Sequence, residues 1–335
     1  MFLVLFAFLE PSFGGVVLLY HHVADDTPAL TSIKVAQFER HLETIEENGY
    51  EVVSLKSLYK TSLDSFSLDK KVAITFDDGY KNILTNALPL LKKRDWPFTI
   101  FVSTKFVGVS KSYLNWEDLS FLEQNGATIG NHTHSHAHLV RRGASETEEE
   151  WLARVESEII TAKEILNSKG HKSLVFAYPY GEYNKKVRDV VRNFGMTGFG
   201  QHSGAIGPDS DPLILPRFPL AGAYTGIQAL RDKLGSLAMP LETTYQAPLV
   251  AENLMPSLRL NFTDPSLRVD NVNCFGPGGL MEITKTSSTE ISIKPKQEVP
   301  IGRSRYNCTL RYKNRYFWHS QLWMRKKADG TWYEE

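Results

Sequence analysis

Residues 72–79, Val-Ala-Ile-Thr-Phe-Asp-Asp-Gly, join a short apolar run to two adjacent carboxylates. The run 72–76 is typical of a buried strand. Placing Asp77 and Asp78 together at the end of such a strand costs desolvation and charge repulsion, which a metal cation would offset. Because Gly79 follows, both carboxylates can turn toward one site, so that one binds the metal and the other stays free as a base. A helix N-cap is the alternative interpretation of Asp-Asp-Gly.

Strands and helices alternate on both sides of this stretch. Other short apolar runs predict strands at 16–20, 98–102, 127–130, 174–178 and 196–199. Helical spacing and glycine stops predict helices from 35 to a stop at 49, and at 81–94, 116–125, 145–168 and 183–193. About seven or eight such units favour an α/β fold in which a parallel sheet forms a (β/α) barrel.

The pattern changes after residue 238. Residues 239–255 show no clear periodicity and are interpreted as a linker. From 256 to 335, alternating segments such as 258–262 and 290–294 predict a small all-β, sandwich-like domain. The last thirty residues hold eight aromatic side chains, which we expect to fill the core of this domain. The alternative is an accessory module whose exposed rings bind a glycan or a partner protein.

Composition narrows the range of partners. The chain has 335 residues, enough for about two domains. Its 38 basic and 38 acidic side chains give a formal net charge of zero, which argues against nucleic acid or an anionic membrane surface as a partner. No phosphate-binding glycine loop is present.

The N-terminus and the cysteines bear on the compartment. Residues 1–14 resemble the end of a secretory signal peptide, too short for a transmembrane helix, although a buried N-terminal strand is the alternative. A signal peptide predicts a periplasmic or secreted protein of the bacterial envelope. In that setting Cys274 and Cys308 would form one disulfide, whereas two reduced buried thiols are the other interpretation.

A second polar segment is rich in histidine. Residues 131–138 read Asn-His-Thr-His-Ser-His-Ala-His and hold four of the ten histidines of the chain. Imidazoles in such tracts typically bind metals such as zinc, cobalt or nickel. His132 and His136 would share one side of a helical turn, and His134 and His138 would do the same, so the spacing alone does not choose the pair.

A third segment, residues 176–183, reads Phe-Ala-Tyr-Pro-Tyr-Gly-Glu-Tyr. Proline and glycine after an apolar strand predict a tight turn. Such a turn can direct a backbone N–H toward a substrate oxygen, although taken alone it is ordinary turn chemistry.

Taken together, the three segments resemble those of the polysaccharide deacetylases, carbohydrate esterase family 4, over about residues 15–235. The resemblance implies an irregular (β/α) barrel of the NodB type for residues 15–238. It implies that Asp78, His132 and His136 bind a divalent metal, usually zinc, and that Asp77 is the general base acting on the water that this metal activates. The backbone N–H of Tyr180 would stabilise the oxyanion.

The chain departs from the family pattern where a catalytic acid is expected. The usual late Leu-x-His motif and the usual arginine of the third segment are both absent. Instead, Tyr20-His21 on the first strand resembles a segment of the poly-N-acetylglucosamine deacetylases of biofilm export systems. We therefore expect His21 to be the acid, with His202 as the competing candidate, and Arg217 to orient Asp77.

The resemblance implies a metal-dependent hydrolase that removes N-acetyl groups from an N-acetylglucosamine polysaccharide. Poly-β-1,6-N-acetylglucosamine is the preferred substrate on the subgroup resemblance. Chitin oligomers and peptidoglycan remain alternatives, as do hydrolysis of another C–N amide bond and a glycan-binding protein that has lost activity.

Overall fold

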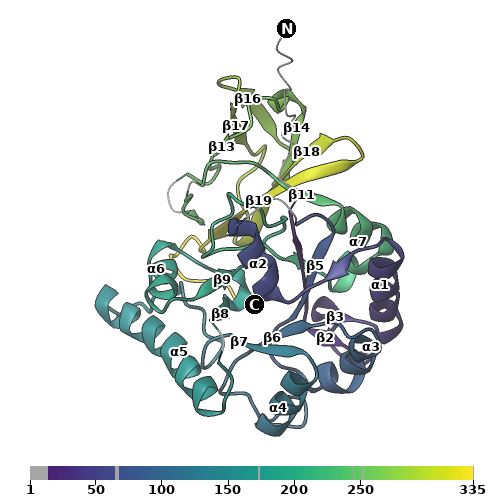
Figure 1. The fold of residues 1–335 in the computed structure, drawn as a ribbon. Helices are drawn as coiled ribbons and strands as arrows, with labels where there is room; N and C mark the ends of the chain where they lie inside the picture. Colours follow the sequence, from purple (N-terminus) through teal and green to yellow (C-terminus); the bar gives the residue numbers. More distant parts are fainter. Residues whose placement is uncertain (1–13, 65–67, 173, 244, 251–252, 335) are drawn as a thin grey trace.

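The computed structural model describes residues 14–334 apart from 65–67, 173, 244 and 251–252 (Figure 1). The signal peptide expected over 1–14 therefore lies outside the described residues, except for Gly14. No helix in the described part of the chain combines the length and the apolar character needed to cross a bilayer.

A parallel sheet of eight strands forms the first part of the fold, with β10-β1-β5-β6-β7-β8-β9 in order and β4 beside β5. Its strands are β1 (Val16–Tyr20), β4 (Glu51–Val52), β5 (Lys71–Phe76), β6 (Phe98–Val102), β7 (Ala127–Asn131), β8 (Val175–Ala177), β9 (Thr197–Phe199) and β10 (Phe218–Pro219). Strands β1 and β6 are buried along their whole length, as expected for a parallel sheet covered on both faces. The predicted (β/α) barrel is confirmed as an open one.

One segment spans the gap between the two edge strands. Phe199 of β9 forms a bridge with Leu215, and Phe218 of β10 pairs with Leu18 of β1. The few residues between Leu215 and Phe218 thus connect both edges and hold Arg217 at the inside of the barrel, where its side chain is fully buried.

Helices surround this sheet (Figure 1). They are α1 (Val35–Glu47), α2 (Leu55–Asp64), the π-helical η2 (Ile83–Ala87) continuing into α3 (Leu88–Lys92), α4 (Trp116–Gln124), α5 (Glu148–Ser168), α6 (Lys185–Asn193) and α7 (Ile227–Leu234). Short elements lie between them: β2 (His22–Val23), β3 (Ser32–Ile33), η1 (Ala29–Thr31), η3 (Pro179–Gly181) and η4 (Gly222–Thr225). Helix α5 begins at a capping box in which the Thr147 and Glu150 side chains bind each other's backbone N–H.

The remaining strands form two sheets of the all-β kind. A six-stranded sheet has the order β11-β19-β18-β14-β15 with β12 beside β19, and a three-stranded sheet has the order β13-β17-β16. The strands are β11 (Ser236–Ala238), β12 (Leu249–Val250), β13 (Leu258–Asn261), β14 (Val272–Gly276), β15 (Gly279–Leu280), β16 (Glu282–Lys285), β17 (Glu290–Lys294), β18 (Gly302–Tyr312) and β19 (Arg315–Arg325), with η5 at Val269–Asn271. Strand β12 falls within the stretch that we interpreted as a linker.

Strands β18 and β19 separate two hydrophobic cores. Tyr306, Leu310 and Phe317 pack into the core between the two C-terminal sheets. Leu322 and Met324 pack instead into a core shared with the barrel. Because side chains alternate along a strand, one face of this hairpin covers its own core and the other covers the barrel. The opening of the barrel beside this second face contains the polar residues that the sequence singled out.

Cys274 and Cys308 form a disulfide across β14 and β18. Both side chains are fully buried in the C-terminal core. The bridge closes a loop with a sequence separation of 34, and the loop-entropy relation gives such a bridge about 3–4 kcal/mol of stabilisation. Of the two interpretations that the sequence left open, the structure shows the disulfide.

Candidate metal-binding active site

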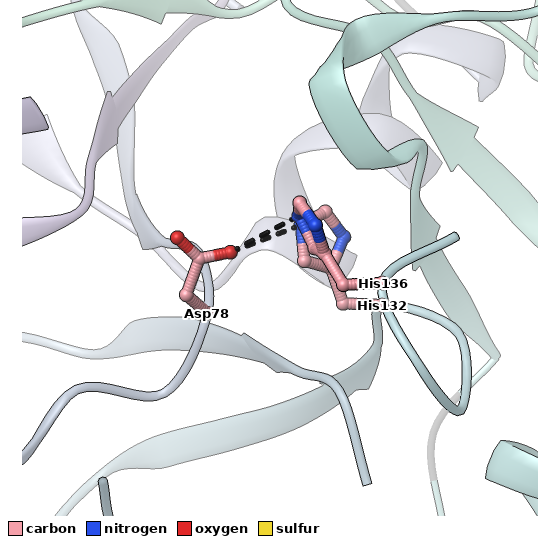
Figure 2. Close-up of side chains that lie close together, drawn as sticks. All are labelled: Asp78, His132 and His136. Carbon is pink, nitrogen blue, oxygen red and sulfur yellow. Dashed lines mark ion pairs between the residues drawn. The ribbon is translucent and has the colours of Figure 1, made fainter. Parts of the chain in front are cut away.

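Asp78, His132 and His136 converge at the carboxyl ends of β5 and β7 (Figure 2). The Oδ1 atom of Asp78 lies 3.5 Å from His132 Nε2 and 3.3 Å from His136 Nε2. One ligand atom from each of the three residues lies within 4.8 Å of the others. A carboxylate and two imidazoles at this separation match a usual donor set for zinc.

The hydrogen bonds around the cluster leave its ligand atoms available. His132 Nδ1 donates to the carbonyl oxygen of Ala177 at 2.8 Å, which fixes the proton on Nδ1 and leaves the lone pair on Nε2. His132 Nε2 and Asp78 Oδ1 are both buried without a hydrogen-bond partner among the described residues. Burial alone would raise the pKa of Asp78, but the two rings hold it well below its ordinary value. Unpartnered buried donor atoms around a carboxylate fit a bound cation.

A loop, not a helical turn, brings the two histidines together. Thr133 and His136 adopt positive φ angles of 69° and 58°, so this segment does not form the helical turn that would place residues four apart on one side. The loop is held by its own side chains: Asn131 Oδ1 accepts from Thr133 N at 2.8 Å, and Thr133 Oγ1 accepts from His136 N at 3.0 Å.

The other two histidines of this segment point elsewhere. His134 Nδ1 pairs with Thr104 Oγ1 at 2.9 Å, and His138 Nδ1 donates to Glu182 Oε2 at 2.9 Å. The structure therefore groups His132 with His136 and leaves the alternative pair outside the cluster.

Asp77 lies beside the cluster but is held by a different partner. Arg217 donates to both of its carboxylate oxygens, at 2.7 Å and 2.8 Å, and both side chains are fully buried. Burial alone would raise the pKa of Asp77, but the charge of Arg217 and its hydrogen bonds hold that pKa below its ordinary value. Asp77 is therefore an ionised, fixed acceptor with Oδ2 at 4.0 Å from His132 Nε2.

His21 and Tyr180 border the same cavity as the cluster. A pocket of about 760 Å³ is lined by His21, Asp78, His136 and Tyr180. Its volume lies within the usual range for ligand sites. A larger cavity of about 930 Å³ lies between the barrel and the C-terminal sheets, and His202 lines that cavity, not the first one. Burial lowers the pKa of His202 to about 3, with neighbouring positive groups adding to the shift.

His21 lies in a bend between β1 and β2, directly after the first strand on which we expected it, and the next residue, His22, does not line this pocket. Its ring stacks on Tyr80 with a centroid separation of 3.5 Å, and its Nδ1 atom lies 2.8 Å from Asn82 Nδ2. Burial lowers the pKa of His22 to about 4, so this ring is neutral at neutral pH.

A buried carboxylate, Glu182, fixes the Tyr180 turn to the C-terminal strands. It accepts from His138 at 2.9 Å, from Tyr333 Oη at 2.7 Å and from Arg303 at 3.3 Å. The His138 ring in turn stacks on Tyr180, with centroids 3.7 Å apart and an interplanar angle of 8°. Tyr180 has a φ of 58°, which is unfavourable for a tyrosine, so this packing holds a strained turn in place.

The sequence did not identify Glu182, because its partners come from three distant parts of the chain. Its one local signal was its place directly after Pro-Tyr-Gly.

Replacing Glu182 by glutamine is expected to destabilise the protein at pH 7 and to reduce the amount of stability that the protein loses between pH 7 and pH 3. Although burial opposes it, the His138, Tyr333 and Arg141 partners lower the pKa of Glu182 to about 2. The pKa of Glu182 is lower in the folded protein than in the unfolded chain, where it is about 4.3. The ionised carboxylate therefore stabilises the folded protein above that pH, here by about 3 kcal/mol, and this stabilisation is lost as the pH falls toward 2. Urea unfolding at pH 7 and pH 3 measures this contribution. An equal loss of stability between the two pH values in both proteins would contradict it.

Comparison with known proteins gives the site its context. Residues 67–199 match the family model described as polysaccharide deacetylase. This segment is a polysaccharide deacetylase domain. It contains five of the site residues: Asp77, Asp78, His132, His136 and Tyr180.

Relatives of the deacetylase domain agree with this assignment. The chain is 29% identical over 214 residues to YxkH of Bacillus subtilis, covering 63% of this chain and 72% of that protein. It is 27% identical over 194 residues to the poly-beta-1,6-N-acetyl-D-glucosamine N-deacetylase of Staphylococcus aureus strain MRSA252, covering 56% of this chain and 67% of that enzyme.

Solved structures share the fold of the deacetylase domain. The deacetylase PplD of Streptococcus pyogenes superposes with a TM-score of 0.59 at 21% identity, over 66% of this chain and 98% of PplD. IcaB of Ammonifex degensii superposes with a TM-score of 0.58 at 24% identity, over 65% of this chain and 96% of IcaB. About a third of this chain thus lies outside the shared fold.

Proposed function

We propose that this protein is a metal-dependent hydrolase that removes N-acetyl groups from an N-acetylglucosamine polysaccharide. One observation carries the proposal: the clustered ligand atoms of Asp78, His132 and His136 stand beside a carboxylate, Asp77, that Arg217 holds by two hydrogen bonds. Of these ligand atoms, Asp78 Oδ1 and His132 Nε2 are buried without a hydrogen-bond partner among the described residues. A cation site next to a fixed base is the arrangement that hydrolysis of an unactivated amide requires.

Asp78, His132 and His136 would hold the metal, which we take to be zinc, with cobalt or nickel as substitutes. When bound, a divalent metal supplies an activated water and polarises the acetamide carbonyl. The donor set of one carboxylate and two imidazoles leaves coordination positions for ligands from outside the protein.

The remaining residues act on protons and charge. Asp77 would take the proton from the attacking water, and Arg217 would keep Asp77 ionised and oriented. The backbone N–H of Tyr180 would stabilise the oxyanion, since the turn places Tyr180 at the rim of the same pocket. His21, which lines the same pocket, would protonate the leaving amine.

Substituting His21 is expected to slow the reaction without releasing the metal. A His21→Asn variant removes the proposed acid, and loss of one such group lowers kcat by about 10²–10⁴-fold. His202→Asn serves as the matched control, because His202 lines the other cavity. Acetate release and zinc content of both variants measure the effect. If the His202 variant loses activity while the His21 variant retains it, the acid is misassigned.

The pocket suits a sugar chain. Rings of Tyr80, Phe106 and Tyr113 stack on one another along one wall, and Trp318 lies on the wall formed by β19. Aromatic faces of this kind pack against pyranose rings. The name of the Staphylococcus aureus relative supports poly-β-1,6-N-acetylglucosamine as the polymer.

The proposal extends to organisation and location. We propose residues 15–238 as the catalytic domain, 239–255 as a linker and 256–335 as an accessory domain. We also place the protein in the envelope or outside the cell, where the Cys274–Cys308 disulfide would persist.

Acetate release from N-acetylglucosamine oligomers with β-1,6 or β-1,4 linkages tests the substrate. We expect the zinc-loaded protein to release acetate from the β-1,6 series with the higher kcat/KM. A preference for the β-1,4 series would replace the proposed polymer with chitin-like or peptidoglycan-derived chains. Acetate release from neither series would contradict the proposed function.

A further inference from the structure

The C-terminal strands contribute side chains to the pocket of the proposed active site. Arg303, Arg305 and Asn307 alternate along β18 and lie on the face turned toward the barrel. All three line the 760 Å³ pocket that also contains Asp78 and His136. The accessory sheet therefore forms a wall of the cavity in which the substrate would lie.

The charges that line this pocket are unbalanced. Three cationic side chains line it, those of Lys233, Arg303 and Arg305. Asp78 is the one acidic residue of the lining, and it is a proposed metal ligand. With a divalent cation bound, the pocket carries a clear excess of positive charge, which favours an anionic ligand.

Arg305 differs from the other arginines of the C-terminal strands. Arg315 pairs with Asp69 at 2.7 Å, and Arg325 pairs with Glu298 at 2.9 Å. In the part of the chain that the structure describes, the Arg305 side chain has no hydrogen bond or ion pair, and its Nε atom is buried. Guanidinium groups stay protonated, so this cation lacks a counter-charge in a mostly enclosed place.

Neighbouring side chains do not balance the positive charge of Arg305. Arg303 lies close enough to oppose the Arg305 charge. Arg303 itself has Glu182 as a partner, at 3.3 Å. A half-buried charge without a partner is costly, and a ligand with the opposite charge removes that cost.

We propose that Arg305, with Arg303 beside it, binds an anionic substituent of the glycan, a carboxylate or a phosphate ester. This inference rests on the proposed function and makes it more specific, because it names as the substrate an N-acetylglucosamine chain that carries acidic substituents. The planar guanidinium can donate two parallel hydrogen bonds to either kind of anion. The hydroxyl groups of a neutral sugar could accept hydrogen bonds from Arg305 but would not balance its charge.

Matched oligomers test the inference with the zinc-loaded full chain. The substrate is an N-acetylglucosamine pentamer that carries one carboxymethyl ether per chain at mixed positions. The reference is its neutral carboxamidomethyl analogue, and a pentamer with one phosphate monoester separates the two kinds of anion. We expect kcat/KM for at least one anionic pentamer to exceed that of the neutral one by about tenfold, the effect of one charge-assisted hydrogen bond.

Arg305→Gln is expected to bring that ratio close to one. Arg311→Gln is the matched control, because Arg311 lies on the same strand, is exposed and does not line the pocket. The control should keep the ratio of the unaltered protein. A ratio near one in the unaltered protein, or a ratio that survives in the Arg305 variant, would overturn the inference.

Failure of the proposed function gives a different result. If none of the pentamers releases acetate, calorimetry with the unaltered protein measures their affinities directly, since no turnover interferes. Tighter binding of an anionic pentamer that is lost in Arg305→Gln would then support the anion site without the hydrolase. Equal affinities for all three pentamers would overturn the anion site as well.

Discussion

Replacement of Asp77 by asparagine is expected to lower acetate release by about 10³-fold while zinc stays bound. The amide cannot accept a proton from the attacking water, and loss of a general base costs about 10²–10⁴-fold. Asp77 is not one of the three clustered ligand residues, so its loss should leave the metal site intact. Acetate assays combined with elemental analysis of zinc measure both parts of this prediction.

The same substitution disturbs a buried ion pair, so stability must be controlled. Arg217 would lose its bidentate partner, and removing one member of a buried pair costs about 3–5 kcal/mol. Assays should therefore be run below the unfolding transition, which circular dichroism locates. A folded, zinc-containing Asp77→Asn protein with undiminished activity would show that another group is the base.

Loss of any member of the cluster is expected to abolish both zinc binding and activity. Asp78→Ala, His132→Ala and His136→Ala each remove one of three protein ligands. Since outer-shell substitutions alone cost about 10–100-fold in metal affinity, removal of a ligand should exceed 100-fold. Competition with a chromogenic zinc chelator measures the affinity of each variant.

The same loop provides matched controls for these variants. His134 and His138 lie two residues from the proposed ligands but pair with Thr104 and Glu182. We expect His134→Ala and His138→Ala to keep zinc affinity within about tenfold, the lower end of the outer-shell range. Loss of zinc from either control, with zinc retained in the His132 or His136 variant, would show that we assigned the wrong pair of histidines to the metal.

The parallel sheet could be predicted because its signal is local. Buried strands such as β1, β5 and β6 are short apolar runs that need no partner to be recognised. Their carboxyl ends meet at one edge of the barrel, so the polar segments that follow them had to lie near one another. The segments that contain Asp78, His132 and His136 could be singled out in this way. The choice of His132 and His136 over His134 and His138 came from the resemblance to the polysaccharide deacetylases.

Other features depend on contacts that a local pattern does not contain. The short helix α7 and strand β10 lie outside the elements that we predicted, since both are brief and take their stability from packing on β1 and α1. The conformation of the His132–His136 loop depends on two residues with positive φ, which no propensity favours for threonine or histidine.

The contacts that side chains of the C-terminal strands make could not be predicted from the sequence either. Aromatic residues were expected to fill a small core, and Tyr306, Phe317 and Trp323 do so. Trp318, Arg303 and Arg305 line the pocket instead, because β18 and β19 present one face to each core. Which face a residue takes is set by strand register against the barrel, a long-range property.

Titration of zinc into the metal-stripped protein, followed by acetate release from β-1,6-linked N-acetylglucosamine oligomers, tests the central claim most directly. We predict that activity is absent without metal, rises in proportion to bound zinc and levels off at about one zinc per chain, as a site with three protein ligands requires. Undiminished acetate release by the zinc-free protein would contradict this account. So would one zinc bound per chain with no acetate released.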